Sequence, residues 1–317
     1  MAFNKIRFLI IGGIIAALSL FPLTVKSDYL INFLILLFLN ITITQSWNIL
    51  GGFTGQISIG QSAFFGIGAL ATRLLWMADI PILLALLGGG LAAVVLAAFI
   101  GLPSLRLRGV YFAIATLGLA IITRVVVGNA FPGVSFLPAK YLASFSLTPR
   151  YYLALALVLI TIGVVYFLIN SKLGIGMAAI KNDEEAASAL GINTFKCKVY
   201  SLAISTFLAG LAGGVYAFYS AVYYYYVPFE ISWSFDPLLM AVIGGAGTIL
   251  GPILGAIGYV LLKEIFTVMI GKFNVLIFGT LFIITVLALP GGLIEVWEKF
   301  QKFHTSLILK REGKRSQ

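Results

Sequence analysis

The sequence contains very little of the chemistry that catalytic and metal sites use. Among its 317 residues there is one cysteine, Cys197, and one histidine, His304. A lone cysteine excludes an intramolecular disulfide, and one cysteine with one histidine supplies too few ligands for a His/Cys metal site. We also find no convergent set of acids and bases of the kind an active site needs. The sequence therefore predicts no enzyme activity and no cofactor bound by this chain.

Charged residues are equally scarce. They make up 10% of the chain, whereas 61% of its residues are hydrophobic, and its mean hydropathy is +1.07. A soluble domain averages roughly 25% charged residues. The apolar residues form continuous runs near the length that spans a bilayer as a helix, instead of the short alternating segments of a β-barrel. We therefore predict an all-α integral membrane protein.

The apolar runs predict a polytopic helical bundle that forms one domain over residues 1–317, with about 10 (8–10) transmembrane segments and glycine-broken helices. Pro237 suits a helix start, because its missing N–H costs nothing there. Eight crossings result if one broken segment near each of two glycine clusters is re-entrant. The expected spans are 8–25, 29–50, 59–77, 80–102, 109–128, 152–169, 199–222, 237–250, 252–270 and 274–289.

Lysine and arginine gather in alternate loops, and such loops face the cytoplasm. Both termini are therefore expected to be cytoplasmic, with a cytoplasmic loop over 171–198 and a basic cytoplasmic tail over 292–317. The net charge of +10 is then a topology signal and indicates no nucleic-acid partner. Of the 21 basic residues, 14 lie in these segments: Lys5, Arg7, Arg106, Arg108, Lys172, Lys181, Lys196, Lys198, Lys299, Lys302, Lys310, Arg311, Lys314 and Arg315.

Two glycine-rich segments, 51–62 and 244–252, interrupt the apolar runs. Interrupted segments at matching places in two halves of a transporter indicate a site near the middle of the membrane. Uncharged polar residues gather around the first break. Hydrogen bonding between helices uses the same residue types, so that structural role stays open beside a transport role. The candidates for a translocation path are Asn40, Thr44, Asn48, Gln56, Ser58, Gln61, Gly244 and Gly245.

Several other polar residues lie at or inside predicted spans. Lys263 and Glu264 are adjacent, so they face different directions and each needs its own partner or a wet cavity, unless the span is shifted and both lie near its end. Arg73 and Arg124, near outer helix ends, are expected to reach the lipid headgroups, and a substrate role is the alternative. The run of tyrosines at 223–226 is expected to form an interfacial aromatic belt, and a role in gating or partner docking is the alternative.

The loop 171–198 contains a short predicted helix over 183–190. Asn182 can act as its N-cap, with Glu185 completing a capping box, and acidic residues fill the first turn, where the helix dipole favours them. Gly191 can end the helix. A helix this short is marginal alone, so we expect it to dock on the membrane domain or on a cytoplasmic partner.

The run Glu185-Ala186-Ala187-Ser188-Ala189-Leu190-Gly191 resembles the Glu-Ala-Ala-x-x-x-Gly loop of ATP-binding-cassette (ABC) importer permeases. The stretches 46–52, 60–69, 107–117 and 241–252 resemble the branched-chain amino-acid branch of that family, the LivM-type permeases. The resemblance implies that the loop forms a coupling helix seated in a cleft of an ATPase subunit. The implied coupling residues are Asp183, Glu184, Glu185, Ala186, Ala187 and Gly191.

The resemblance further implies a permease subunit of an importer for branched-chain or related hydrophobic amino acids, in a prokaryotic inner or plasma membrane. Its implied partners are a second homologous permease, two ABC ATPase subunits and an extracytoplasmic substrate-binding protein. ATP and Mg²⁺ belong to the ATPase, since this chain has no Gly-x-x-x-x-Gly-Lys-Ser/Thr loop. Urea, amide or aromatic-acid substrates are alternatives within the family. An ion-coupled secondary transporter, with Lys263 and Glu264 as coupling residues, is the alternative from another class.

Overall fold

The computed structural model describes residues 2–25, 27–142, 145–270 and 280. Its long helices are α1 (Ala2–Thr24), α2 (Asp28–Asn48), α3 (Gln61–Met77), α4 (Ile82–Leu96), α6 (Val110–Ala130), α8 (Leu147–Ile169), α11 (Thr194–Tyr219), α12 (Ser232–Gly244) and α13 (Leu250–Ile270). Its short elements are η1 (Ile49–Phe53), η2 (Ala97–Gly101), α5 (Leu102–Ser104), β1 (Val134–Phe136), α7 (Ala139–Leu142), α9 (Lys172–Asn182), α10 (Glu184–Ala189), β2 (Val222–Tyr224) and η3 (Val227–Phe229).

The structure confirms a polytopic helical membrane protein. Among the described residues, 5 helical segments are long and apolar enough to cross a bilayer: Asp28–Phe53, Ile82–Phe99, Val110–Ala130, Leu147–Ile169 and Thr194–Tyr219. The predicted span 274–289, apart from residue 280, and the tail 292–317 lie outside the described residues. One feature was not predicted, since β1 and β2 form a small antiparallel sheet in which Ser135 pairs with Tyr223.

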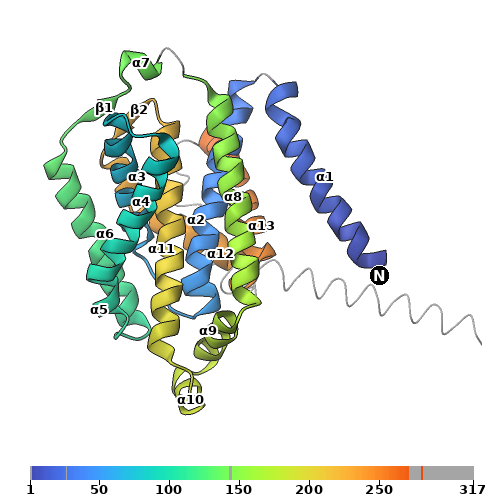
Figure 1. The fold of residues 1–317 in the computed structure, drawn as a ribbon, viewed down its shortest axis with the longest axis vertical. Coiled ribbons are helices and arrows are strands. Elements are labelled where there is room, and N and C mark those ends of the chain that lie inside the picture. Colours follow the sequence, from blue (N-terminus) through green and yellow to red (C-terminus); the bar gives the residue numbers. More distant parts are fainter. Residues whose placement is uncertain (1, 26, 143–144, 271–279, 281–317) are drawn as a thin grey trace, which may run out of the picture.

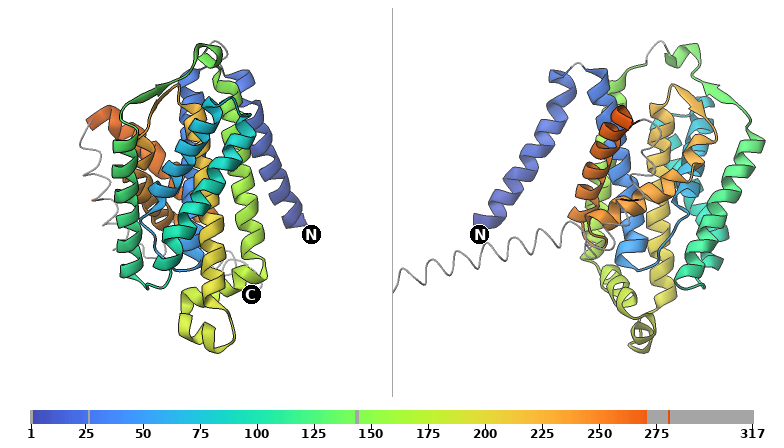
Figure 2. Two further views of the ribbon diagram at one scale, coloured as in Figure 1. Left: turned by 60° about the vertical axis from the view of Figure 1, so that its left-hand side comes forward. Right: turned by 180° about the vertical axis from the view of Figure 1, so that it is seen from behind.

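The bundle has two distinct ends (Figure 1). The short helices α5, α9 and α10 lie at one end, which we call the α10 end, and the N-terminal end of α1 points the same way. The helix α7 and the β1–β2 sheet lie at the opposite end, which we call the sheet end. Figure 2 shows α1 on the side of the bundle beside α8. There the Tyr151 and Tyr152 hydroxyls donate to the Leu18 and Ser19 carbonyls of α1.

Helices α2 and α11 form the centre of the bundle. Every residue of α2 from Ile41 to Asn48 is buried, as expected for a helix that is surrounded by other helices. Small residues let α11 approach its neighbours closely, because the α3 and α11 backbones touch where Gly68 meets Gly210. This is the packing that membrane helices use when side-chain burial alone does not drive association.

Several boundaries differ from the predictions. Helix α2 does not end at Leu50 but continues through the π-helical turn η1 to Phe53. Helix α12 begins at Ser232, so Pro237 lies inside it and does not start it. Helix α11 begins at Thr194, where the Asn193 side chain accepts from the Lys196 N–H as an N-cap. The loop 171–198 also contains α9, an 11-residue helix that was not predicted.

Candidate functional site

The predicted short helix exists as α10, but its first turn is built differently. Asn182 belongs to α9, and Asp183 is the N-cap of α10. The Asp183 carboxylate accepts hydrogen bonds from the backbone N–H groups of Glu185 and Ala186, at 2.8 and 3.0 Å. The prediction of Asn182 as cap was therefore wrong by one residue. Both side chains are good caps, but only Asp183 has the extended backbone that a cap requires.

Gly191 ends α10, as predicted. Its φ is +84°, a left-handed conformation that favours glycine. The Ile192 N–H donates to the Ala187 carbonyl, and the Gly191 N–H donates to the Ser188 carbonyl. These two bonds form a Schellman motif, which satisfies carbonyl groups at the end of the helix.

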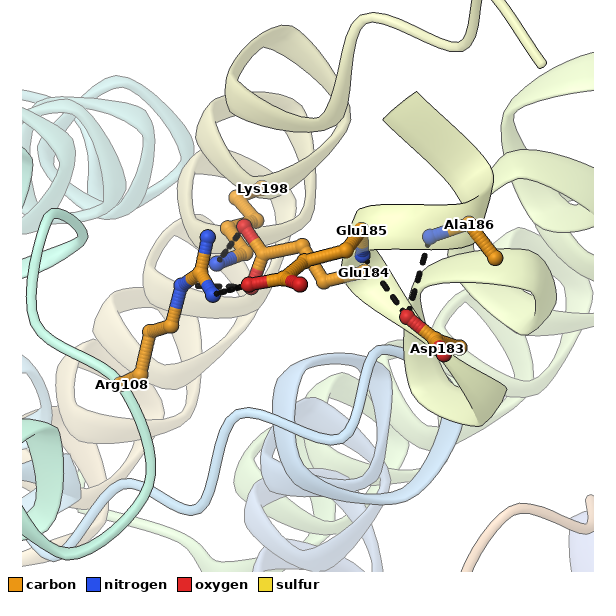
Figure 3. Close-up of polar contacts among 6 residues, drawn as sticks. All are labelled: Arg108, Asp183, Glu184, Glu185, Ala186 and Lys198. Atoms are coloured by element: carbon orange, nitrogen blue, oxygen red, sulfur yellow. Dashed lines mark hydrogen bonds and ion pairs between the residues drawn. The ribbon is translucent and has the colours of Figure 1, made fainter. Parts of the chain in front are cut away.

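The acidic residues of α10 do more than complement the helix dipole (Figure 3). Glu184 accepts from buried Lys198 of α11, with 2.6 Å between the charged atoms, and lies 3.7 Å from Arg108. Glu185 pairs with Arg108, in the loop before α6, at 2.8 Å. These carboxylates, Glu185 first, raise the pKa of Arg108. The sequence showed the charges but not their partners. Arg108 is 77 residues away from Glu185, and Lys198 is 14 residues away from Glu184.

The ion pairs hold α10 in place and leave part of it uncovered. Ala187 is buried, whereas Ala186 and Ala189 are exposed and Leu190 is 82% exposed. An exposed leucine on a short helix fixed at the tip of the bundle is suited to a docking contact, because burying it on a partner would release apolar surface from water. Because ion pairs fix α10 in place and Leu190 is exposed beside it, α10 is the first candidate functional element.

The two glycine-rich breaks, far apart in sequence, meet in the structure through Asn48. Its side-chain oxygen accepts from the Gly247 N–H, and its amide donates to the Thr248 carbonyl, both at 2.8 Å. A Cβ on Gly52 would overlap the Asn48 oxygen and the Gly247 nitrogen. Glycine is thus required at Gly52 by close approach. This contact is the second candidate element.

The hydrogen-bonding groups of the other path candidates are mostly satisfied by protein groups. Gly244 ends α12, and Gly245 follows it with a φ of +117°. The predicted polar residues have these partners: Asn40 donates to Leu36 O, Thr44 to Asn40 O, Gln61 to Ser46 Oγ, and Ser58 Oγ accepts from Gly60 N. Gln56 differs, since its side-chain oxygen is buried without a hydrogen-bond partner among the described residues.

Lys181, in the last turn of α9, lies between the two candidate elements. Its backbone lies against Gly55, just after the first break, and its side chain lies against Gly247 in the second break. Asn182 and Asp183 then lead directly into α10. The sequence offered no signal for this arrangement beyond a lysine in a loop.

Arg73 does not reach the headgroups, contrary to expectation. Its side chain is fully buried and donates to the carbonyls of Ala217, Ser220 and Ser135. It also lies over the rings of Trp76 and Tyr223. A guanidinium has five donors, and here they bind the end of α11 to β1. Tyr223 is also buried, contrary to its predicted place in an aromatic belt, whereas Tyr224 and Tyr226 are exposed.

Lys263 and Glu264 face different directions, as predicted, and each has a partner. Lys263 pairs with Asp236 of α12 at 2.7 Å, and Tyr259 donates to the same carboxylate. Glu264 accepts from Tyr29, at the start of α2, at 2.7 Å. The partners tie α13 to α12 and to α2, which is a structural role. Within the described ranges, no group of three or more His, Cys, Asp or Glu residues can hold a metal ion.

Comparisons with known proteins agree with this architecture. A family model described as "Branched-chain amino acid transport system / permease component" matches residues 29–286. The high-affinity branched-chain amino acid transport system permease protein LivM of Escherichia coli (strain K12) is 29% identical over 290 residues, and its Salmonella typhimurium counterpart is 27% identical. Each of these alignments covers 78% of this chain and 66% of the relative.

A more distant relative is the probable branched-chain amino acid transport permease protein LivM of Methanocaldococcus jannaschii, 26% identical over 142 residues, with 40% of this chain and 41% of the relative covered. No solved structure matches the chain. The chain therefore spans just under two thirds of the length of the bacterial relatives it matches. Because the family model covers most of the chain, this multi-pass membrane protein belongs to the family of permease components of branched-chain amino acid transport systems.

Proposed function

We propose that this chain is a transmembrane permease subunit of an ABC importer for branched-chain amino acids. The observation that carries the proposal is the structure of α10. This short helix is capped at both ends, is held in place by ion pairs and leaves Leu190 exposed. Family membership supports the substrate class. ATP and Mg²⁺ are expected on partner ATPase subunits, and this permease binds no cofactor.

The proposed assembly contains a second homologous permease, two ABC ATPase subunits and an extracytoplasmic substrate-binding protein. In it the α10 end faces the cytoplasm, because the basic residues Arg106, Lys172 and Lys196 lie in the loop and the first helical turns at that end. The proposal keeps about ten crossings with both termini cytoplasmic, in a prokaryotic inner or plasma membrane. The coupling residues are Asp183, Glu184, Glu185, Ala186, Ala187 and Gly191.

Coupling would run from α10 along two routes. One route passes through the Glu184–Lys198 ion pair into α11, at the centre of the bundle. The other passes through the end of α9, where Lys181 lies against both glycine-rich breaks. A displacement of α10 by ATP-driven closure of the partners would then shift the Gly52–Gly247 contact. Such a shift at discontinuous helices is a physical basis for alternating access.

We assign the translocation path to the uncharged polar residues around the first glycine-rich break. Gln56 is its strongest member, because a buried amide oxygen without a partner costs free energy unless a ligand or water satisfies it. Asn48, in contrast, holds the two breaks together. Gln56→Leu should therefore change the uptake KM or substrate range with normal protein levels, whereas Asn48→Ala should lower protein stability. Unchanged leucine, isoleucine and valine uptake in Gln56→Leu would remove Gln56 from the path.

The test of the coupling role is a matched pair at Gly191, with Gly191→Asp and Gly191→Asn compared in ATP-dependent uptake of labelled leucine. Asn and Asp both tolerate the left-handed conformation, so the pair differs chiefly in charge. We expect Gly191→Asp to abolish uptake while membrane levels stay normal, and Gly191→Asn to retain most of it. Normal uptake in Gly191→Asp would refute docking of this helix end.

A further inference from the structure

A surface pocket of about 460 Å³ opens between α6 and the two residues that flank η3 at positions 226 and 231. Its lining is mainly apolar, but it also includes the polar residues Arg124, Asn129 and Tyr226. The residues that line it are Ile121, Arg124, Val125, Gly128, Asn129, Tyr226 and Ile231. The pocket lies toward the sheet end, since α6 runs from the α10 end to the sheet end (Figure 1).

Arg124 is the unusual member of this lining. It is half-buried and lies six residues before the last residue of α6, so its backbone is about 9 Å along the axis from the helix end. Among the side chains of residues 12–25, 27–99, 101–142 and 145–266, no carboxylate forms an ion pair with it and no group hydrogen-bonds to its side chain. Arg73 and Arg150, by contrast, donate to backbone carbonyls. An intramembrane arginine without a protein partner requires an anion or water to solvate it.

The surroundings of Arg124 favour an anion with apolar chains. Ile121 is 44% exposed and Val125 is 54% exposed, and both lie on the outer side of α6. Helix α6 also exposes Ile122 and Val126, in a segment apolar enough to face hydrocarbon. The lining has one full positive charge and no carboxylate, so it complements a net negative group better than a zwitterionic amino acid.

We propose that this pocket is a phospholipid site that holds the headgroup phosphate on Arg124. Asn129 and Tyr226 line the same pocket, so their amide and hydroxyl groups would donate to phosphate oxygens, and the acyl chains would follow Ile121 and Val125 along α6. Arginine suits this role because its planar fork binds two phosphate oxygens at once. The site lies in the leaflet at the sheet end and is independent of the coupling function.

The experiment measures phosphatidylglycerol retained by the full chain after purification and detergent washing, by mass spectrometry. The variants are Arg124→Gln, Asn129→Ala and, as matched control, Arg106→Gln, which removes an exposed arginine at the α10 end. Thermal unfolding of each variant verifies the fold. An excess of inorganic phosphate is added in one arm, and phosphatidylcholine replaces phosphatidylglycerol in another.

We expect Arg124→Gln to lose retained phosphatidylglycerol about tenfold, as for one charge-assisted contact. Asn129→Ala should lose less, Arg106→Gln should match the wild type, and inorganic phosphate should not compete. Equal retention in Arg124→Gln and the wild type would overturn the proposal. Full competition by inorganic phosphate would show an anion site without lipid preference. A changed uptake KM, or loss of a co-purifying subunit, with unchanged lipid would place Arg124 on the substrate path or an interface instead.

Discussion

The two ends of the bundle are held by basic residues in opposite ways. At the sheet end, Arg73 is fully buried and donates to backbone carbonyls of α11 and β1. At the α10 end, Arg108 and Lys198 bind carboxylates of α10, and the Arg108 side chain is 61% exposed. Backbone carbonyls cannot change charge or move independently of their helix, whereas carboxylates on a short helix can be displaced. The comparison indicates a fixed end and an adjustable end.

The largest expected effect is at the fixed end. Arg73→Leu would leave the Ala217, Ser220 and Ser135 carbonyls without their donor in a buried region. We expect a loss of about 3 kcal/mol in the free energy of unfolding, measured in mixed micelles. Arg73→Lys keeps the charge but not the planar fork, so it should lose an intermediate amount. Wild-type stability in Arg73→Leu would show that this end is not fixed by Arg73.

The α10 anchor consists of the Glu184–Lys198 and Glu185–Arg108 ion pairs, and the next effect concerns its buried half, Glu184–Lys198. Lys198→Met removes the partner of Glu184 and leaves a carboxylate that is only 21% exposed. Uptake should fall by about tenfold or more, because the largely buried Glu184 carboxylate would keep only its longer contact with exposed Arg108, at 3.7 Å, and α10 would shift to hydrate it. Adding Glu184→Gln should restore part of the loss. The control is Lys196→Met, an exposed neighbour, and equal losses in both lysine variants would contradict the prediction.

A smaller effect is expected at the exposed half of the same anchor. Arg108→Gln removes a solvent-exposed ion pair with Glu185, and such pairs contribute little. Uptake should fall less than about fivefold. High salt screens exposed charges, so in inside-out vesicles it should lower the transport rate of the wild type toward that of Arg108→Gln. The transport rate of the variant should change little with salt. A loss as large as that of Lys198→Met would remove the distinction between the two halves of the anchor.

The smallest effect concerns an exposed contact at the sheet end. The Tyr141 hydroxyl and then Lys140 hold the pKa of Asp79 below its ordinary value. A carboxylate with a lowered pKa in the folded state stabilises the protein above its unfolded pKa, and this contribution is lost as the pH falls through the folded pKa. Below about pH 4 the melting temperature of the wild type should therefore approach that of Asp79→Asn. A constant difference at all pH values would contradict this.

Much of the architecture was predictable from the chain alone. Runs of apolar residues near the bilayer thickness required helices, because the membrane interior offers the backbone no other partner. Gly191 and the acidic turn predicted α10 to within a residue, since caps act over a few positions along the chain. The error at Asn182 arose because two adjacent residues were suitable caps and only the backbone conformation distinguished them.

The environment of each charge was not predictable. Arg73 and Arg124 looked alike in sequence, each near the outer end of an apolar run. One is enclosed by α11, β1 and two aromatic rings, and the other lines an open pocket. Likewise, nothing local showed that Asn48 would join residues about 200 positions away.

The sequence by itself determined the class of protein, the approximate positions of its helices and the family, because hydrophobic length, basic loops and short motifs are local properties. The tertiary structure decided which side chains are anchors and which are open to a ligand. Those assignments depend on which helices pack together. Two residues of the same type and similar flanks, such as Arg73 and Arg124, therefore acquire different roles only when the bundle is assembled.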